Sequence, residues 1–215
     1  MPPSPAPNTC VAFLVRHGAT ANNVADPPRL QGCRVDPGLS DAGREQAGRA
    51  AELLAAYPLA AIYSSPLSRA METAVCIAKP HALAVREVAE LREVDVGRWE
   101  NRSWVEIETT EPEAHRRFME DASTYGYPEG ENMTEVLARV GPAMESLLRA
   151  HGGQQIAIVG HNVVNRVFLA HVLGVPLSQA RRITHDNCGV SAVRYREGGL
   201  RLLTLNATFH LDRNA

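Results

Sequence analysis

The chain has 215 residues, of which 45% are apolar and 21% are charged. This is an ordinary globular composition with enough length for a well-buried core, so it excludes a disordered chain, a collagen-like fibre and a coiled coil. The formal net charge is -2, from 22 basic and 24 acidic side chains. The electric field of the whole molecule is therefore weak, and nucleic acid is not expected as a partner.

The cysteines and the N-terminal residues indicate the cellular compartment of the protein. Cys10, Cys33, Cys76 and Cys188 are spread along the chain without a C-x-x-C motif, which favours reduced thiols over a disulfide framework or a zinc site. The N-terminal stretch lacks the basic region of a signal peptide, and no apolar run is long enough to span a bilayer. We therefore expect a cytoplasmic protein.

The first half of the chain reads as strands alternating with helices. A Pro-rich segment, residues 1–9, is expected to be a disordered leader, and the chain then continues as an apolar, β-branched run typical of a strand buried on both faces. The predicted elements are strands at 10–15, 59–63 and 83–85, a helix at 41–56 capped by Ser40, and a helix that opens at Ser65-Pro66 and ends near Ala78.

The second half returns to the same alternation after an interruption. Residues 90–130 carry Trp, Glu, Pro and Gly with only short helical stretches, which indicates a lid. Helices are predicted at 133–150 and 163–173, and strands at 156–159, 189–195 and 200–205. We expect one domain over residues 10–215, a three-layer α/β/α fold with a central, mostly parallel sheet and a helical lid insertion. The apolar last strand would allow pairing in a homodimer.

Unusual polar residues lie at the ends of three predicted strands. Arg16 and His17 follow the first strand, Arg69 lies in the helix after the second, and His161 follows the strand at 156–159. The carboxyl ends of parallel strands meet in one crevice, where helix N-termini present unpaired N–H groups. Two histidines, two arginines and a helix N-terminus form a pocket for a doubly charged anion, and phosphate fits this description.

Chemistry on that phosphate needs a nucleophile and an acid. An imidazole can attack phosphorus when one ring nitrogen is free and the other is held as a donor, which gives a phosphohistidine. The leaving oxygen needs a proton from a carboxylic acid above the pocket. The acidic segment 91–100 offers Glu93, Asp95 and Glu100 for this role.

The order of these motifs resembles a known family. The stretches that carry the resemblance are LVRHGAT at 14–20, QG at 31–32, YSSPLSRAMETA at 63–74, LREVDVGRWEN at 91–101, PEGEN at 128–132 and VGHN at 159–162. Together they resemble the histidine phosphatase superfamily, also called the phosphoglycerate-mutase-like family, from about residue 11 to residue 205. The resemblance implies the fold described above.

The resemblance also implies roles for individual residues. His17 would be the phosphorylated nucleophile, Arg16, Arg69 and His161 would hold the phosphoryl group, and Glu93 would be the proton donor. The implied substrate-binding residues are Asn23, Gln31, Gly32 and Asn162. The scheme requires no metal and no other cofactor, and its ligand is a small phosphorylated metabolite or inorganic phosphate.

Further details favour the phosphatase branch of the family. Mutases of the family usually carry a longer insertion. The ending DNCGVSAVRY with LNATFHL resembles metal-independent phosphoserine phosphatases, whose tail histidine helps to close over the substrate. His210 is the matching position, which makes it a further implied substrate-binding residue. Ala19 stands where the family often has Glu, and Asn162 where Gly is common. These departures leave the substrate open. We expect a phosphomonoesterase that acts through phosphohistidine on a small metabolite, phosphoserine being one candidate.

Two other functions stay open at this stage. The chain could act as a phosphoglycerate mutase, or bind a phosphorylated ligand without turnover.

A metal site from His17, His161 and His210 has no supporting ligand spacing. The C-x5-R spacing from Cys10 to Arg16 is read as coincidence, because the intervening residues should be paired in a strand. His171 is expected in the helix core and His185 in a turn.

Overall fold

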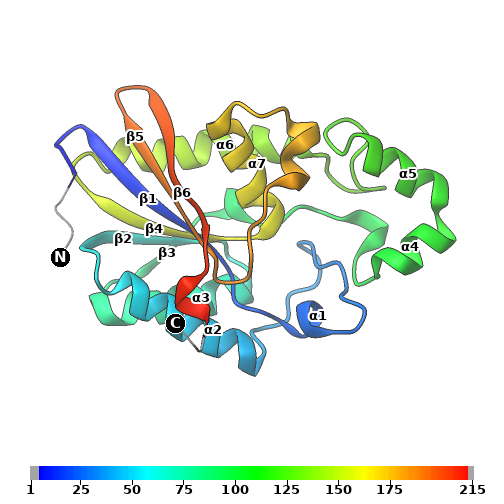
Figure 1. Ribbon diagram of the computed structural model, residues 1–215, viewed down its shortest axis with the longest axis horizontal. Helices are drawn as coiled ribbons and strands as arrows, with labels where there is room; N and C mark the ends of the chain where they lie inside the picture. Colours follow the sequence, from blue (N-terminus) through cyan, green and yellow to red (C-terminus); the bar gives the residue numbers. More distant parts are fainter. Residues whose placement is uncertain (1–4, 213–215) are drawn as a thin grey trace.

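The computed structural model describes residues 5–212, which are built around a six-stranded sheet (Figure 1). The strands are β1 (Thr9–Arg16), β2 (Leu59–Ser64), β3 (Val85–Glu87), β4 (Gln155–Gly160), β5 (Val190–Arg196) and β6 (Gly199–Ala207). Their order across the sheet is β3-β2-β4-β1-β5-β6. The first four of these run parallel, whereas β5 pairs antiparallel with β1 and β6 antiparallel with β5. The predicted mostly parallel sheet is confirmed.

Helices cover both faces of this sheet. In Figure 1, α2 (Asp41–Leu54) and α3 (Ser68–Ala78) lie on one face, and α6 (Met133–Ala150) and α7 (Asn162–Leu173) on the other. Successive strand residues point to opposite faces, so Leu14 packs with the α6 and α7 core, while Phe13 and Val15 pack with α2 and α3. A strand whose two faces both pack against apolar helix surfaces must itself be apolar throughout. The three-layer architecture is confirmed.

The segment predicted as a lid contains two short helices. Figure 1 shows α4 (Trp104–Thr110) and α5 (Pro112–Glu120) beyond the end of the sheet. Trp99 is fully buried between them. The centroid of its ring lies 5.4 Å from that of Phe118 and 5.9 Å from those of Trp104 and Tyr127. These aromatic rings extend the core that α6 and α7 form with the sheet, because all belong to one hydrophobic cluster. That these residues form an insertion in a single domain stays a prediction.

Shorter elements complete the described chain. They are α1 (Ala21–Val24) and the 3-10 helices η1 (Lys79–His81), η2 (Ala89–Leu91), η3 (Gly97–Trp99), η4 (Leu177–Arg182) and η5 (Phe209–Leu211). Cys10 lies fully buried in β1, paired opposite Tyr195. The residues between Cys10 and Arg16 are thus strand and not a phosphate loop. No helix within residues 5–212 combines the length and apolar character needed to cross a membrane.

Several predicted boundaries are wrong. The leader ends earlier than expected, because Thr9 belongs to β1; residues 1–4 lie outside the described part of the chain. Helix α3 begins at Ser68, since the Ser65 hydroxyl bonds to a distant histidine, described below. The third strand covers Val85–Glu87 instead of 83–85. His171 is exposed beside Glu145 at 3.3 Å, so its predicted place in the core is wrong.

Candidate active site

The carboxyl ends of β1, β2 and β4 meet at one edge of the sheet, as the strand pattern predicted. Arg16 lies opposite Gly160, and Ser64 opposite Val159, in the parallel register. The residues that follow these positions therefore converge. The rings of His17 and His161 lie 5.2 Å apart between centroids, although the two histidines come from distant parts of the sequence.

His17 is held as a neutral imidazole with one free nitrogen. Its Nδ1 lies 2.7 Å from the Gly18 carbonyl oxygen, and because a carbonyl can only accept, Nδ1 carries the proton and donates it. Burial, together with Arg16 and Arg69, lowers the pKa of His17 well below its usual value. The Nε2 atom therefore keeps its lone pair, which is the state that a nucleophile needs.

His161 is oriented by a hydroxyl group. Its Nε2 lies 2.7 Å from Ser65 Oγ, and that oxygen also accepts the Leu67 N–H at 3.3 Å. Burial and the nearby arginines lower the pKa of His161 well below its usual value, so the ring is neutral. When the Ser65 hydroxyl donates to Nε2, the proton of His161 sits on Nδ1, which is buried and without a partner in the described chain.

The charges of both predicted arginines act on the two histidines. Arg16 donates through Nη1 to the His185 carbonyl oxygen at 2.9 Å. Arg69 is fully buried, donates through Nη2 to the Gly32 carbonyl oxygen at 2.8 Å and lies 3.3 Å from Asp36. Burial lowers the pKa of Arg16 to about 10 and lowers that of Arg69. The Nε atoms of both are buried and without a partner in residues 5–212. Native structures rarely tolerate such groups unless an ion or ligand satisfies them.

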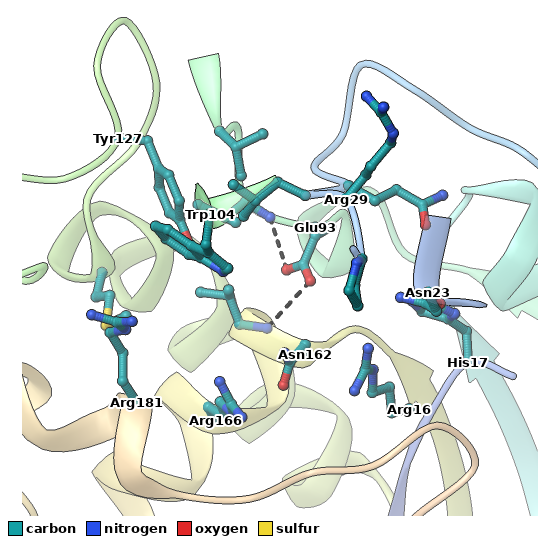
Figure 2. Close-up of a pocket in the computed structure, with 17 residues that line it drawn as sticks. Arg16, His17, Asn23, Arg29, Glu93, Trp104, Tyr127, Asn162, Arg166 and Arg181 are labelled. Carbon is teal, nitrogen blue, oxygen red and sulfur yellow. Dashed lines mark hydrogen bonds between the residues drawn. The ribbon is translucent and has the colours of Figure 1, made fainter. Parts of the chain in front are cut away.

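Glu93 is the acid of this site. It is 3% exposed, and its carboxylate accepts from the backbone N–H groups of Val94 (2.9 Å), Val163 (3.2 Å) and Val164 (3.3 Å). The last two belong to the first turn of α7, where unpaired amides and the helix dipole favour a carboxylate. Figure 2 shows Glu93 held in this way above Asn162, on the side of the cavity opposite Arg16 and Arg166.

These groups border a cavity of about 210 Å³, which is the size of a small metabolite. Six of the predicted site residues line it, namely Arg16, His17, Asn23, Gln31, Glu93 and Asn162. Arg69 and His161 lie buried next to them and do not line the cavity itself. Thr20 donates to Gln31 Oε1 at 2.7 Å, which fixes the side chain of Gln31 at the rim.

Two predicted substrate-binding residues lie elsewhere. Gly32 contributes its backbone, whose N–H donates to Glu100 at 2.7 Å and whose carbonyl oxygen accepts from Arg69. His210 lies in η5, which packs against α2, and its Nε2 is 3.0 Å from the Cys188 carbonyl oxygen. Neither lines the cavity. A direct role of either side chain in substrate binding is therefore not supported by this arrangement.

The sequence reasoning missed three arginines, since Arg166, Arg181 and Arg29 line the cavity together with Trp104. His185, expected in a turn, is buried beside Arg16 with both ring nitrogens unpartnered in the described chain. Arg166 could have been found, because it lies one helical turn after Asn162 and so on the same face of α7. Within residues 5–212 no cluster of three or more His, Cys, Asp or Glu side chains is arranged to hold a metal ion.

Comparison with known proteins decides the family. Residues 12–208 match the model of the histidine phosphatase superfamily (branch 1). The chain belongs to this superfamily. Phosphoserine phosphatase 1 of Hydrogenobacter thermophilus is 34% identical over 199 residues, which cover 93% of each chain. A Yersinia pestis protein named probable phosphoglycerate mutase GpmB is 32% identical over 208 residues, covering 94% of this chain and 95% of its own.

The fold of this histidine phosphatase agrees with solved structures. The mycobacterial glucosyl-3-phosphoglycerate phosphatase Rv2419c superposes with a TM-score of 0.83 at 28% identity, covering 93% of this chain and 99% of its own. The predicted family and fold class are confirmed. Membership of the superfamily supports phosphatase or mutase activity, and the relatives support a phosphorylated small molecule as the ligand.

Proposed function

We propose that this histidine phosphatase is a phosphomonoesterase that hydrolyses a small phosphorylated metabolite through a phosphohistidine at His17. One observation carries the proposal. Buried N–H donors of Arg16, Arg69 and His161 have no partner within residues 5–212, and they surround a neutral histidine whose Nε2 is free. Unpartnered N–H donors beside a nucleophilic nitrogen are suited to the oxygens of a phosphoryl group.

In the first step, the Nε2 lone pair of His17 attacks phosphorus. A P–N bond forms while the bond from phosphorus to the ester oxygen breaks. Glu93, in its protonated form, gives its proton to that oxygen, so the alcohol leaves without charge. Arg16, Arg69 and the Nδ1–H of His161 stabilise the negative charge on the three other oxygens of the moving phosphoryl group.

In the second step, water replaces the alcohol. Glu93, now a carboxylate, takes a proton from the water while its oxygen attacks phosphorus. The P–N bond breaks, inorganic phosphate leaves, and both His17 and Glu93 return to their starting states. The three backbone amides that bind Glu93 keep its carboxyl group in one orientation for both steps. The charges needed for the transfer come from side chains, and we propose that no metal ion takes part.

The test is phosphate release from a panel of esters in EDTA, with the His17→Ala variant as control. The panel contains phosphoserine, 3-phosphoglycerate, sugar phosphates and p-nitrophenyl phosphate. Release that depends on His17 and survives EDTA supports the proposal. Unchanged release by His17→Ala would refute the nucleophile, loss of release in EDTA would refute metal independence, and no release from any ester would favour a binding protein.

Mutase activity is a second candidate, favoured by the 32% identity to the Yersinia pestis protein named as a phosphoglycerate mutase. Both reactions begin with the same phosphohistidine, and they differ in whether water or a second hydroxyl group takes the phosphoryl group. Incubation with 3-phosphoglycerate separates them. A mutase forms 2-phosphoglycerate, whereas a phosphatase releases inorganic phosphate and glycerate.

Location and assembly belong to the same proposal. The four cysteines are free thiols, which supports a cytoplasmic location because disulfides are rare there. The edge strand β6 exposes Leu203 and Leu205, which supports pairing of β6 with a second copy of the chain. Light scattering of the purified protein measures this assembly directly; a dimer mass is expected, and a monomer mass at micromolar concentration would contradict it.

A further inference from the structure

The cavity holds more positive charge than a phosphoryl group needs. Besides Arg16, it is lined by Arg29, Arg166 and Arg181, and among its lining residues in the described chain Glu93 is the one acid. Under the proposed function, Arg16 and Arg69 already face the phosphoryl oxygens. The remaining guanidinium groups therefore have to be explained by the part of the ligand that leaves.

Two of these arginines have other partners. Arg29 donates to the Asn101 carbonyl oxygen at 2.8 Å and lies 3.9 Å from Glu106. The Arg181 guanidinium lies over aromatic rings, 4.9 Å from the centroid of Phe118 and 5.4 Å from that of Trp104. Both are thus tied to the lid, where they contribute to its packing.

Arg166 is different, because within residues 5–212 no hydrogen bond, ion pair or ring contact holds its guanidinium group. Its Nε is buried without a partner, and burial lowers its pKa. The two acids whose charges act on it are otherwise engaged: Glu93 accepts three amides, and Asp186 accepts from Asn206 at 2.8 Å. A desolvated guanidinium without a counter-charge is costly, and an anionic ligand group would offset that cost.

The position of Arg166 fits this role. It lies one turn after Asn162 on α7, and Figure 2 shows it beside Asn162, with Arg16 on one side and Arg181 on the other. Asn162 and Arg166 line the same cavity as Arg16 and His17, so an ester whose phosphoryl group lies at His17 has both within the space left for its leaving group. The Oδ1 atom of Asn162 is also buried without a partner in the described chain. That oxygen can accept from a hydroxyl or ammonium group.

We propose that Arg166 binds a carboxylate on the leaving group, and that Asn162 accepts a hydrogen bond from a hydroxyl or ammonium group on the carbon next to it. This assignment rests on the proposed function. The planar fork of a guanidinium matches a carboxylate in two parallel hydrogen bonds, and a cavity of about 210 Å³ suits a short carbon chain. The substrate class is therefore the phosphate ester of a small 2-hydroxy or 2-amino acid.

The test compares esters that differ only in the carboxylate. In 3-phosphoglycerate a carboxylate replaces one CH2OH group of glycerol 3-phosphate, and phosphoserine has one carboxylate more than phosphoethanolamine. We expect kcat/KM to be at least about tenfold higher for the carboxylated member of one pair or both, the effect of one charged hydrogen-bonded pair. Equal values in both pairs would refute the assignment.

The Arg166→Met variant identifies the residue responsible. The readout is the ratio of kcat/KM for the carboxylated ester to that for its partner without the carboxylate, because a merely structural defect lowers both values alike. We expect this ratio to fall about tenfold or more in Arg166→Met. The exposed Arg182 is the matched control: Arg182→Met removes the same charge from the molecule and should leave the ratio unchanged.

The outcomes separate this inference from the proposed function. If no ester in the panel is hydrolysed, the proposed function is wrong and Arg166 has no leaving group to bind. If esters are hydrolysed with dependence on His17 but Arg166→Met leaves the ratio unchanged, only the assignment of Arg166 is wrong. If Arg182→Met lowers the ratio as much as Arg166→Met, net charge and not a defined contact sets the preference, and the assignment is also wrong.

Discussion

Mild acid should destabilise this protein strongly, because three buried histidines are held neutral. His17, His161 and His185 are at most 4% exposed. Burial and nearby arginines lower the pKa values of all three, that of His185 to about 3. In the unfolded chain each would titrate near its ordinary value of about 6.5. Below that value the unfolded chain binds protons that the folded chain does not.

The sign and size of the pH dependence of stability follow from this difference in proton binding. Stability rises with pH wherever the unfolded state binds more protons, so the free energy of unfolding falls as the pH falls through about 6.5. From about pH 7.5 to about pH 5.5, each histidine removes about 1.4 kcal/mol, and the three together remove about 4 kcal/mol. That is a large part of the roughly 5–15 kcal/mol that stabilises a typical domain.

The assay is urea unfolding across this pH range, in buffers without phosphate, since phosphate would stabilise the folded state. Carboxylates with lowered pKa values, such as Glu131 and Asp95, lose their contribution to the free energy of unfolding only at a pH below this range. The change between about pH 7.5 and about pH 5.5 therefore comes from the histidines. His185→Gln is the matched variant and should reduce the loss between about pH 7.5 and about pH 5.5 by about one third. A free energy of unfolding that stays constant over this range would refute the neutral histidines.

Three substitutions test individual contacts. Glu93→Gln should lower kcat for alkyl phosphates about 100-fold or more and affect p-nitrophenyl phosphate much less, because its leaving group needs no proton; equal losses for both would contradict the proton donor. Ser65→Ala should lower kcat/KM about tenfold or more, because the proton of His161 is no longer directed to Nδ1. Full activity with a native circular dichroism spectrum would contradict that tautomer of His161. Trp99→Ala should cost about 3–5 kcal/mol in the free energy of unfolding, since it leaves a cavity among the aromatic rings of the lid; a loss below about 1 kcal/mol in urea unfolding would show that the lid does not depend on this ring.

The sheet and the phosphate-binding residues could be predicted from the sequence for a simple physical reason. A strand with helices on both faces is apolar throughout, as β1 and β4 are, and parallel topology brings the residues after such strands to one edge. Arg16, His17 and His161 follow directly from that rule. No further knowledge of side-chain packing is needed to place them together.

The errors arise where a partner lies far along the chain. The Ser65-Pro66 pattern resembles a helix start, but the Ser65 hydroxyl bonds to His161, which is 96 positions away. His210 was expected over the substrate, whereas η5 packs against α2 and turns its imidazole to the Cys188 carbonyl oxygen. Local sequence does not encode either contact, because both depend on how separate elements pack.

The residues that face the leaving group were the least accessible to sequence reasoning. Arg166 has the right helical phase after Asn162, but the partly buried state of its guanidinium depends on the positions of Tyr127 in the lid and Arg181 in η4. A sequence rich in arginine offers many such candidates. Only the absence of any hydrogen bond, ion pair or ring contact within residues 5–212 distinguishes Arg166 from Arg29 and Arg181, which contact the lid.

The central claim is that His17 carries the phosphoryl group during turnover. The direct measurement is to mix the protein with a phosphate ester that it hydrolyses, quench with base within milliseconds, and locate the phosphoryl group by mass spectrometry of the peptides. Base is required because phosphohistidine is labile in acid. The account predicts a phosphorylated peptide that contains His17 and that is missing in His17→Ala. A phosphoryl group on any other residue, or none at all while ester is consumed in a single turnover, would contradict it.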